Sequence, residues 1–325
     1  MLFLLASINN DKTTNMLIDW ITYYNHDFIR INQDEPFIDR LDILLDNQNH
    51  FVKLKQISLV NTNNIMLVLW RDSYSWMHSK LLLKSNKLNK DIDDFFFREV
   101  KRIKETIYSI IISNRNIIVN YNNKINKFET LNKARLCGLL MPKFIIASSK
   151  IELIKFKNLN NRIIIKPLSY CQSFSVDNSE YSIFTSELND LEISRLDDHF
   201  FPVFSQQLIE KRFDIKVFFL NGHLFPMAII PVKAVSSIDC RNRTEAGNQR
   251  NVPYKLDHET ERSIIELMEL SKLKFGTIDL IKSLDGLMYF LEINPVGQFG
   301  MISYHCNIPL EKFLIDNIIT TNNGN

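Results

Sequence analysis

The segment KFGTIDLIKSLDGLMYFLEINPVGQFG, residues 274–300, constrains the fold of this chain more than any other part of the sequence. Its two apolar runs, residues 277–281 and 287–293, flank the turn SLDG and predict an antiparallel hairpin. Asp279 lies in the first run, and Glu292 and Asn294 stand two residues apart at the end of the second. Side chains alternate between the faces of a strand, so Glu292 and Asn294 share a face. The hairpin therefore predicts oxygen-bearing side chains grouped within apolar strands.

This group of side chains is typical of a magnesium site. Mg²⁺ prefers carboxylate and amide oxygens, water and phosphate. Burying Asp279 and Glu292 among apolar residues without a counter-ion would be costly, and a bound metal would remove that cost. The alternative is that both acids face solvent or pair with lysine side chains. We favour the metal.

The whole chain predicts an α/β (α+β) protein of several domains, because 325 residues exceed the usual size of a single core. We expect an N-terminal α/β domain over residues 1–119, with parallel strands, and two further subdomains over 120–205 and 206–325. Strands are predicted at 2–6, 27–31, 65–70, 143–147, 162–166, 181–185 and 203–209, a hairpin around Asn221-Gly222, helices at 14–24, 91–113, 128–137 and 259–273, and a polar loop at 168–178.

Composition excludes several classes of partner and site. Lysine plus arginine (39) nearly balances aspartate plus glutamate (37), so we expect no nucleic acid and no membrane partner. No apolar run reaches the roughly 18 residues that a transmembrane helix needs. The four cysteines form no C-x-x-C pair, which argues against a zinc site and disulfides and favours the cytoplasm. No two of the seven histidines have metal-ligand spacing, although His305 lies near the acidic hairpin.

Several segments resemble the ATP-grasp ligases. FGTIDLI and FLEINPVGQF are similar to their C-terminal metal-binding signature, and IIIKPL at 163–168 is similar to the strand that holds a phosphate-binding lysine. NKFETLNKARLCGLLMP at 126–142 resembles an earlier lysine-helix element, and FSQQLIEKRFDIKVFF at 204–219 resembles the adenine hinge. DKTTNMLIDWITYYNHDFIRIN resembles the D-x-T…W…R-x-N opening of the graspetide (microviridin-type, grasp-with-spasm) peptide maturases.

The resemblance implies an ATP-grasp fold in which two subdomains clasp ATP, with ATP and Mg²⁺ as cofactors. The nucleotide-binding residues that it implies are the phosphate lysines, the hinge and a ribose-binding acid: Lys127, Lys166, Gln207, Leu208, Ile209 and Asp214. The metal ligands are Asp279, Glu292 and Asn294. Arg241, with Arg243 as a companion, would lie near the reacting carboxylate or γ-phosphate, and Arg241 and Lys166 would be catalytic.

The sequence departs from the family pattern at three places. The loop after Lys166 has no glycine, where family members often use one for backbone contacts to phosphate. Lys216 stands where an arginine is common, which replaces a planar fork with a point charge. WRDSY at 70–74 matches only part of the Trp-Tyr-Arg-Arg of the peptide maturases, so peptide recognition is less clearly implied than nucleotide binding.

The function that the resemblance implies is ligation within a ribosomally synthesised precursor peptide, made of a leader and a core. MgATP would convert an Asp or Glu side chain to an acyl phosphate, and a Ser or Thr hydroxyl or a Lys amine would attack it. The product is an ester or amide macrocycle. A homodimer is compatible with the resemblance. Two alternatives stay open: a RimK-like amino-acid ligase that modifies a protein or small carboxylate, and a non-catalytic, ATP-regulated binding module of the synapsin-like kind.

Overall fold

A computed structural model describes residues 2–32, 41–45, 50–54, 60–61, 65–70, 90–112, 126–168, 173–176, 179–182, 185–232 and 249–323. Its contacts divide the chain into two compact units, residues 1–123 with 295–325, and residues 124–294. Residues 295–325 were predicted to lie in the C-terminal subdomain, whereas they belong to the unit that contains the N-terminus. The predicted division into three domains otherwise stays a prediction.

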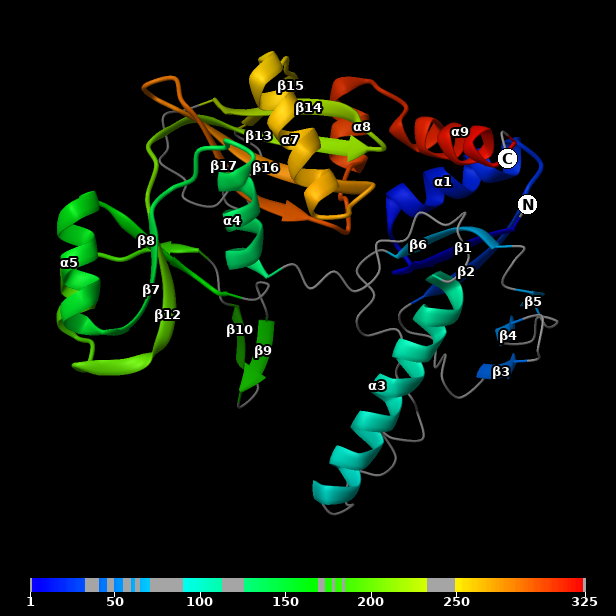
Figure 1. The fold of residues 1–325 in the computed structure, drawn as a ribbon, viewed down its shortest axis with the longest axis horizontal. Coiled ribbons are helices and arrows are strands. Elements are labelled where there is room, and N and C mark those ends of the chain that lie inside the picture. The colour runs from blue at the N-terminus through cyan, green and yellow to red at the C-terminus, as the bar shows by residue number, and fades with distance from the viewer. Residues whose placement is uncertain are drawn as a thin grey trace. The chain divides into compact units, whose positions relative to one another are not determined.

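The first unit contains the predicted parallel sheet (Figure 1), with strand order β2-β1-β6. Its strands are β1 (Leu2–Ser7), β2 (Asp27–Asn32) and β6 (Ile65–Trp70), and both pairings are parallel, as predicted. The predicted helices are also present as α1 (Lys12–Tyr23) and α3 (Lys90–Ile112). An antiparallel sheet of β3 (Leu41–Leu45), β4 (His50–Leu54) and β5 (Val60–Asn61) was not predicted.

Two helices from the end of the chain complete this unit, α8 (Gly300–Cys306) and α9 (Leu310–Asn323). Helix α9 packs against α1, and the Tyr24 hydroxyl, directly after α1, donates to the Asp316 carboxylate at 2.6 Å. Leu314 and Ile315 on α9 and Leu17 and Ile21 on α1 are fully buried. Apolar burial thus explains why the C-terminal segment joins the N-terminal unit.

The second unit begins with helix α4 (Lys127–Leu136) and a sheet of order β11-β8-β12-β7. The strands are β7 (Phe144–Ser149), β8 (Ile163–Lys166), β11 (Ser186–Glu187) and β12 (His199–Gln207). Helix α5 (Lys150–Asn160) follows β7 and α6 (Asp190–Ser194) precedes β12. Leu153 of α5 and Ile163 of β8 belong to a core on one face of the sheet, so side chains of the alternate positions point to the other face.

One prediction in this unit is wrong. The segment 168–178 was expected to be a polar loop, but residues 173–176 form β9 (Ser173–Val176), which pairs antiparallel with β10 (Ser179–Ser182). The alternation of Ser, Phe, Ser and Val is a strand pattern of period two, and it outweighs the polar composition. The strand expected at 181–185 accordingly begins earlier, at Ser179.

The second sheet of this unit has the order β15-β14-β13-β16-β17, and all its pairings are antiparallel. Its strands are β13 (Lys211–Leu220), β14 (His223–Pro231), β15 (Gln249–Pro253), β16 (Phe275–Ser283) and β17 (Met288–Asn294). The hairpin predicted at Asn221-Gly222 is confirmed, and both residues have positive φ (46° and 86°), as a tight hairpin turn requires.

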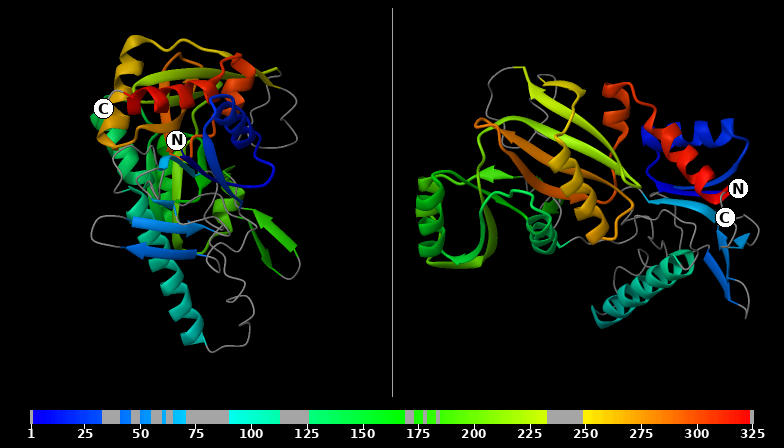
Figure 2. Two further views of the ribbon diagram at one scale, coloured as in Figure 1. Left: turned by 90° about the vertical axis from the view of Figure 1, so that its right-hand side faces the viewer. Right: turned by 45° about the horizontal axis from the view of Figure 1, so that its top comes forward.

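Helices cover one face of this sheet (Figure 2). The predicted helix α7 (His258–Leu270) packs there through Ile264, Leu267 and Met268, in one core with Ile278 and Leu280 of β16. Because side chains alternate along a strand, residues next to these core positions, such as Asp279, point to the opposite face. Within the described part of the chain, no helix is long and apolar enough to cross a membrane.

Candidate active site

The predicted metal ligands lie on neighbouring strands of the second sheet. Asp279 on β16 is the direct cross-strand partner of Glu292 on β17, and Asn294 lies two residues after Glu292, opposite Thr277. Directly opposed residues in an antiparallel pair have Cβ atoms about 4.5–5.5 Å apart. The register of β17 shifts immediately after Asp279, which is the kind of irregularity that changes the direction of nearby side chains. The structure therefore brings the three residues together, while their role as metal ligands stays a prediction.

Each carboxylate also has a lysine beside it. Lys216 on β13, the cross-strand partner of Asp279 on the other side, donates from Nζ to Asp279 Oδ1 at 2.6 Å. Lys127 Nζ lies 3.9 Å from Glu292 Oε2. The side chains of Lys216 and Asp279 are 16% and 28% exposed. The alternative considered above, that the acids pair with lysines, is therefore the arrangement that the structure contains.

The donor set still fits Mg²⁺. Two carboxylates and an amide supply the hard oxygen ligands that this ion uses, with room for water or phosphate oxygens in the remaining positions. Among the described residues no group of three or more His, Cys, Asp and Glu side chains is placed to hold a metal ion. A site of two acids and Asn294 falls outside that pattern, because its third donor is an amide. Such a site suits magnesium bound together with phosphate better than a closed, all-protein metal site.

Lys127 connects the two sheets of this unit at the predicted phosphate position. It is the first residue of α4, whose N-cap Asn126 accepts from the Phe128 N–H at 2.9 Å. Its Nζ donates to the carbonyl oxygen of Pro167 at 2.7 Å, directly after Lys166 at the end of β8. Lys127 therefore links the end of the Lys166 strand to Glu292. Both lysines lie near the end of β8, and their predicted contacts with phosphate stay predictions.

Lys166 is held over an aromatic ring. It is the cross-strand partner of Phe204 on β12, and its Nζ lies 5.6 Å from the centroid of that ring. A cation near the face of an aromatic ring is attracted by the ring quadrupole. The ring thus limits the positions of a side chain that would otherwise be long and flexible.

The predicted hinge, residues 207–209, connects β12 to β13. The Gln207 N–H donates to the Lys143 carbonyl at 2.8 Å, and the Leu208 N–H donates to the Arg162 carbonyl at 2.9 Å. These two bonds fix the hinge against its own sheet. The role of the hinge in adenine binding stays a prediction.

Asp214, the predicted ribose-binding acid, lies on β13 two residues before Lys216, so both side chains point to the same face. It accepts from Lys211 Nζ at 2.8 and 3.0 Å. Arg241 and its companion Arg243 lie outside the described residues, so their predicted role stays a prediction.

Gln206 was not among the predicted site residues. It is only 1% exposed, and neither atom of its side-chain amide has a hydrogen-bond partner among the described residues. It stands opposite Ile164, two positions from the Phe204–Lys166 pair, so its side chain points to the same face as Lys166. An unpaired buried amide is costly, and such groups call for an explanation. The consecutive glutamines in FSQQLI were the available signal, because two amides in an apolar strand are unusual.

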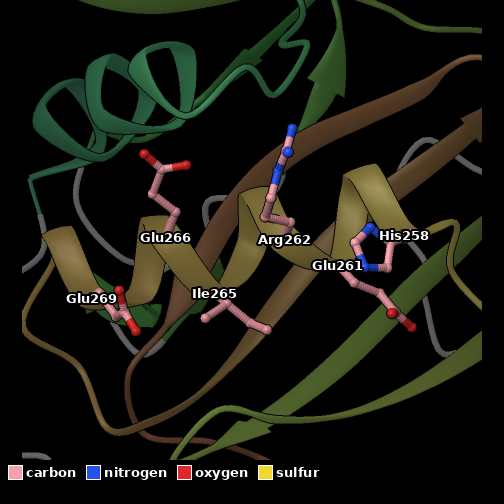
Figure 3. A pocket seen from close by; sticks show the side chains of 6 residues that line it. All are labelled: His258, Glu261, Arg262, Ile265, Glu266 and Glu269. Carbon is pink, nitrogen blue, oxygen red and sulfur yellow. The ribbon is translucent and has the colours of Figure 1, made fainter.

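A shallow pocket lies elsewhere, along helix α7 (Figure 3). Its lining residues are His258, Glu261, Arg262, Ile265, Glu266 and Glu269. Helix α7 covers the core face of the sheet, and the acids of the candidate site point to the opposite face. Figure 3 shows Glu266 directed toward α4. At the end of α4, burial of the Cys137 thiol raises its pKa, and the negative charge of Glu266 raises it further. This pocket is therefore separate from the candidate site.

Comparisons with known proteins support the fold. No family model and no curated protein matches the sequence. Among solved structures, the macrocyclase MdnC from Microcystis aeruginosa, bound with its precursor peptide MdnA, matches with a TM-score of 0.80 at 19% identity, over 99% of this chain and 100% of that one. A RiPP-associated ATP-grasp ligase from Chryseobacterium gregarium, in complex with ADP and a leader and core peptide, matches with a TM-score of 0.80 at 19% identity, over 97% of both chains.

A third match shows how widely this architecture is shared. The D-cycloserine synthetase DcsG matches with a TM-score of 0.56 at 10% identity, over 98% of this chain and 100% of that one. At these identities the likeness establishes the fold. The chain therefore has the predicted ATP-grasp fold, a mixed α/β architecture in which the candidate site lies on the face of the second sheet that α7 leaves uncovered.

Proposed function

We propose that this protein is an ATP-dependent ligase that forms side-chain ester or amide macrocycles in a ribosomally synthesised precursor peptide. The observation that supports this most is the row of Lys216, Asp279 and Glu292 across three strands of an ATP-grasp fold, with Lys127 beside Glu292. The structures with the higher TM-scores are a macrocyclase bound with a precursor peptide and a ligase bound with ADP and a leader and core peptide.

The described residues divide the binding work as follows. Lys127 and Lys166 neutralise phosphate oxygens, because ammonium groups held at the end of β8 stabilise charge that moves during phosphoryl transfer. The hinge at 207–209 and the Gln206 amide hold the base, since a glutamine amide can pair with the adenine amino group and ring nitrogen together. Asp214 accepts from the ribose hydroxyls. Asp279, Glu292 and Asn294 hold Mg²⁺, which would polarise the phosphates.

These residues require no covalent enzyme intermediate. Activation of a peptide carboxylate as an acyl phosphate leaves a group that a hydroxyl or amine attacks directly, so the protein positions the two partners and stabilises charge. Arg241 is proposed to contact the reacting carboxylate or the γ-phosphate. Each ring closure removes the elements of one water molecule from the peptide, and these leave in the phosphate that is released together with ADP.

The test is incubation of the protein with MgATP and the short peptide encoded next to its gene. Mass spectrometry should show losses in multiples of the mass of water, with ADP formed in proportion. A gain of mass would instead identify the amino-acid ligase alternative, which the small-molecule synthetase among the structural matches makes worth testing. Unchanged peptides without ADP, for every candidate precursor, would refute catalysis and leave the binding-module alternative.

A further inference from the structure

Lys216 contacts the Asp279 carboxylate, which the proposed function assigns to a metal ion. Its Nζ contacts Asp279 Oδ1 at 2.6 Å, and the two residues are direct cross-strand partners on β13 and β16. More than two thirds of each side chain is shielded from solvent. The pair is therefore built into the sheet and differs from a chance contact between mobile surface side chains, which contribute little.

Among the described residues of the row, positive and negative charges are equal in number. Lys216 and Lys127 contribute two positive charges, and Asp279 and Glu292 contribute two negative ones. A divalent ion bound to Asp279 would lie only a few ångströms from the Lys216 ammonium, where like charges repel strongly. Because the metal and the ammonium both need the same carboxylate, they compete for it.

We propose that Lys216 is an internal counter-ion that a divalent metal must displace from Asp279, and that the displaced ammonium then binds the anionic group brought in with the metal. This inference rests on the proposed function, since it takes Asp279 as a metal ligand. The flexible stem of lysine allows such a move, whereas a planar guanidinium would hold a carboxylate more rigidly. Lys216 thus couples metal binding to nucleotide binding.

Two consequences of opposite sign follow for a variant without this ammonium. Lys216→Met removes the competitor, so the metal alone should bind more tightly. We expect its affinity to rise by about tenfold. The same variant lacks the cation for the incoming phosphate, so the affinity for ADP in the presence of the metal should fall several-fold. A residue with a merely structural role would not shift the two affinities in opposite directions.

The experiment measures Mn²⁺ binding to the purified full-length protein, without nucleotide, from the electron paramagnetic resonance signal of the free ion. Lys216→Met and Lys216→Gln are compared with wild type, and circular dichroism verifies that each is folded. The matched control is Lys211→Met, because Lys211 lies on the same strand, is 19% exposed and pairs with Asp214 instead. Calorimetric titration with ADP and Mn²⁺ then gives the second affinity.

The expected result is tighter Mn²⁺ binding by both Lys216 variants, unchanged binding by Lys211→Met, and weaker ADP binding by Lys216→Met. Mn²⁺ binding by the folded Lys216 variants that is no tighter than wild type would overturn the proposal. An equal gain in Lys211→Met would also overturn it, because the effect would then come from net charge. Asp279→Asn separates the two levels: if it binds Mn²⁺ with ADP as well as wild type does, the metal site of the proposed function is itself wrong.

Discussion

Replacing the two acids of the candidate site one at a time should separate their structural and functional roles. Lys216 contacts Asp279 at 2.6 Å, whereas Lys127 lies 3.9 Å from Glu292 and keeps a 2.7 Å hydrogen bond to the carbonyl of Pro167. Electrostatic attraction falls with distance, so the first pair is about one and a half times the stronger before screening. It is also the less exposed pair, because the Glu292 side chain is 38% exposed.

We expect Asp279→Asn to lower the free energy of unfolding by about 1 kcal/mol, because a mostly buried Lys216 ammonium loses its charged partner. Glu292→Gln should be neutral or slightly stabilising. It removes a weak ion pair, but it also removes the repulsion between two directly opposed carboxylates. Both substitutions should reduce peptide-dependent ADP formation by roughly a hundredfold or more, since each removes a proposed metal ligand.

Urea unfolding of the nucleotide-free protein, followed by circular dichroism, measures the stabilities, and a coupled assay measures ADP. Asp279→Glu is a useful control, because it keeps the charge and displaces the carboxylate by one methylene. It should recover much of the stability and little of the activity. Equal loss of stability in Asp279→Asn and Glu292→Gln would show that the ion-pair distances in the structure do not determine the energies of the two pairs. Full activity in either variant would refute the assignment of that residue.

Three further changes test other parts of the structure. The Asp257 carboxylate caps α7, and hydrogen bonds from the backbone N–H and hydroxyl of Thr260 outweigh burial and hold its pKa below its ordinary value. Asp257→Ala should therefore lower the free energy of unfolding by about 1 kcal/mol at neutral pH. Its difference from wild type should shrink as acid protonates the Asp257 carboxyl of the folded wild-type protein. Asp257→Asn has no carboxyl at this position, so its stability in urea titrations should lack this contribution to the acid dependence. Gly300→Ala should cost about 1–3 kcal/mol because its Cβ would collide with the Thr13 hydroxyl, and Thr13→Ala in the same chain should restore part of that loss in thermal unfolding. Gln206→Leu should raise the free energy of unfolding by about 1 kcal/mol, because it removes an amide that has no hydrogen-bond partner among the described residues. The same variant should bind ADP more weakly in calorimetry. Lower stability with unchanged ADP affinity would contradict both expectations.

Local patterns in the sequence were sufficient for most of the second sheet. The apolar runs on either side of SLDG predicted β16 and β17, and Asn221-Gly222 predicted the turn between β13 and β14. Both signals depend on residues close together in the chain, because side-chain alternation and turn geometry are local properties. The grouping of Asp279 with Glu292 followed from the same local register.

Features that depend on distant residues were not predictable in this way. Lys216 and Asp279 are 63 positions apart, and their contact requires β13 and β16 to be neighbours. The packing of α9 on α1 joins opposite ends of the chain, and no periodic pattern shows which surface an amphipathic helix will cover. The short strand β9 was missed for a different reason, since its alternation covers only four residues and polar composition gave the opposite indication.

The lysine pairs also change the reason for expecting a metal. Burial of two carboxylates among apolar residues suggested that a cation must accompany them, and Lys216 and Lys127 already provide that charge. Burial alone therefore does not require magnesium. The expectation of a metal depends instead on the donor set, on the ATP-grasp fold and on the position of Lys127 between Glu292 and the end of the Lys166 strand. Since these described residues already match two carboxylates with two ammonium groups, a divalent ion should bind well only together with an anion of similar charge, which is what a nucleotide phosphate supplies. A site balanced in this way favours the metal-nucleotide complex over either component alone.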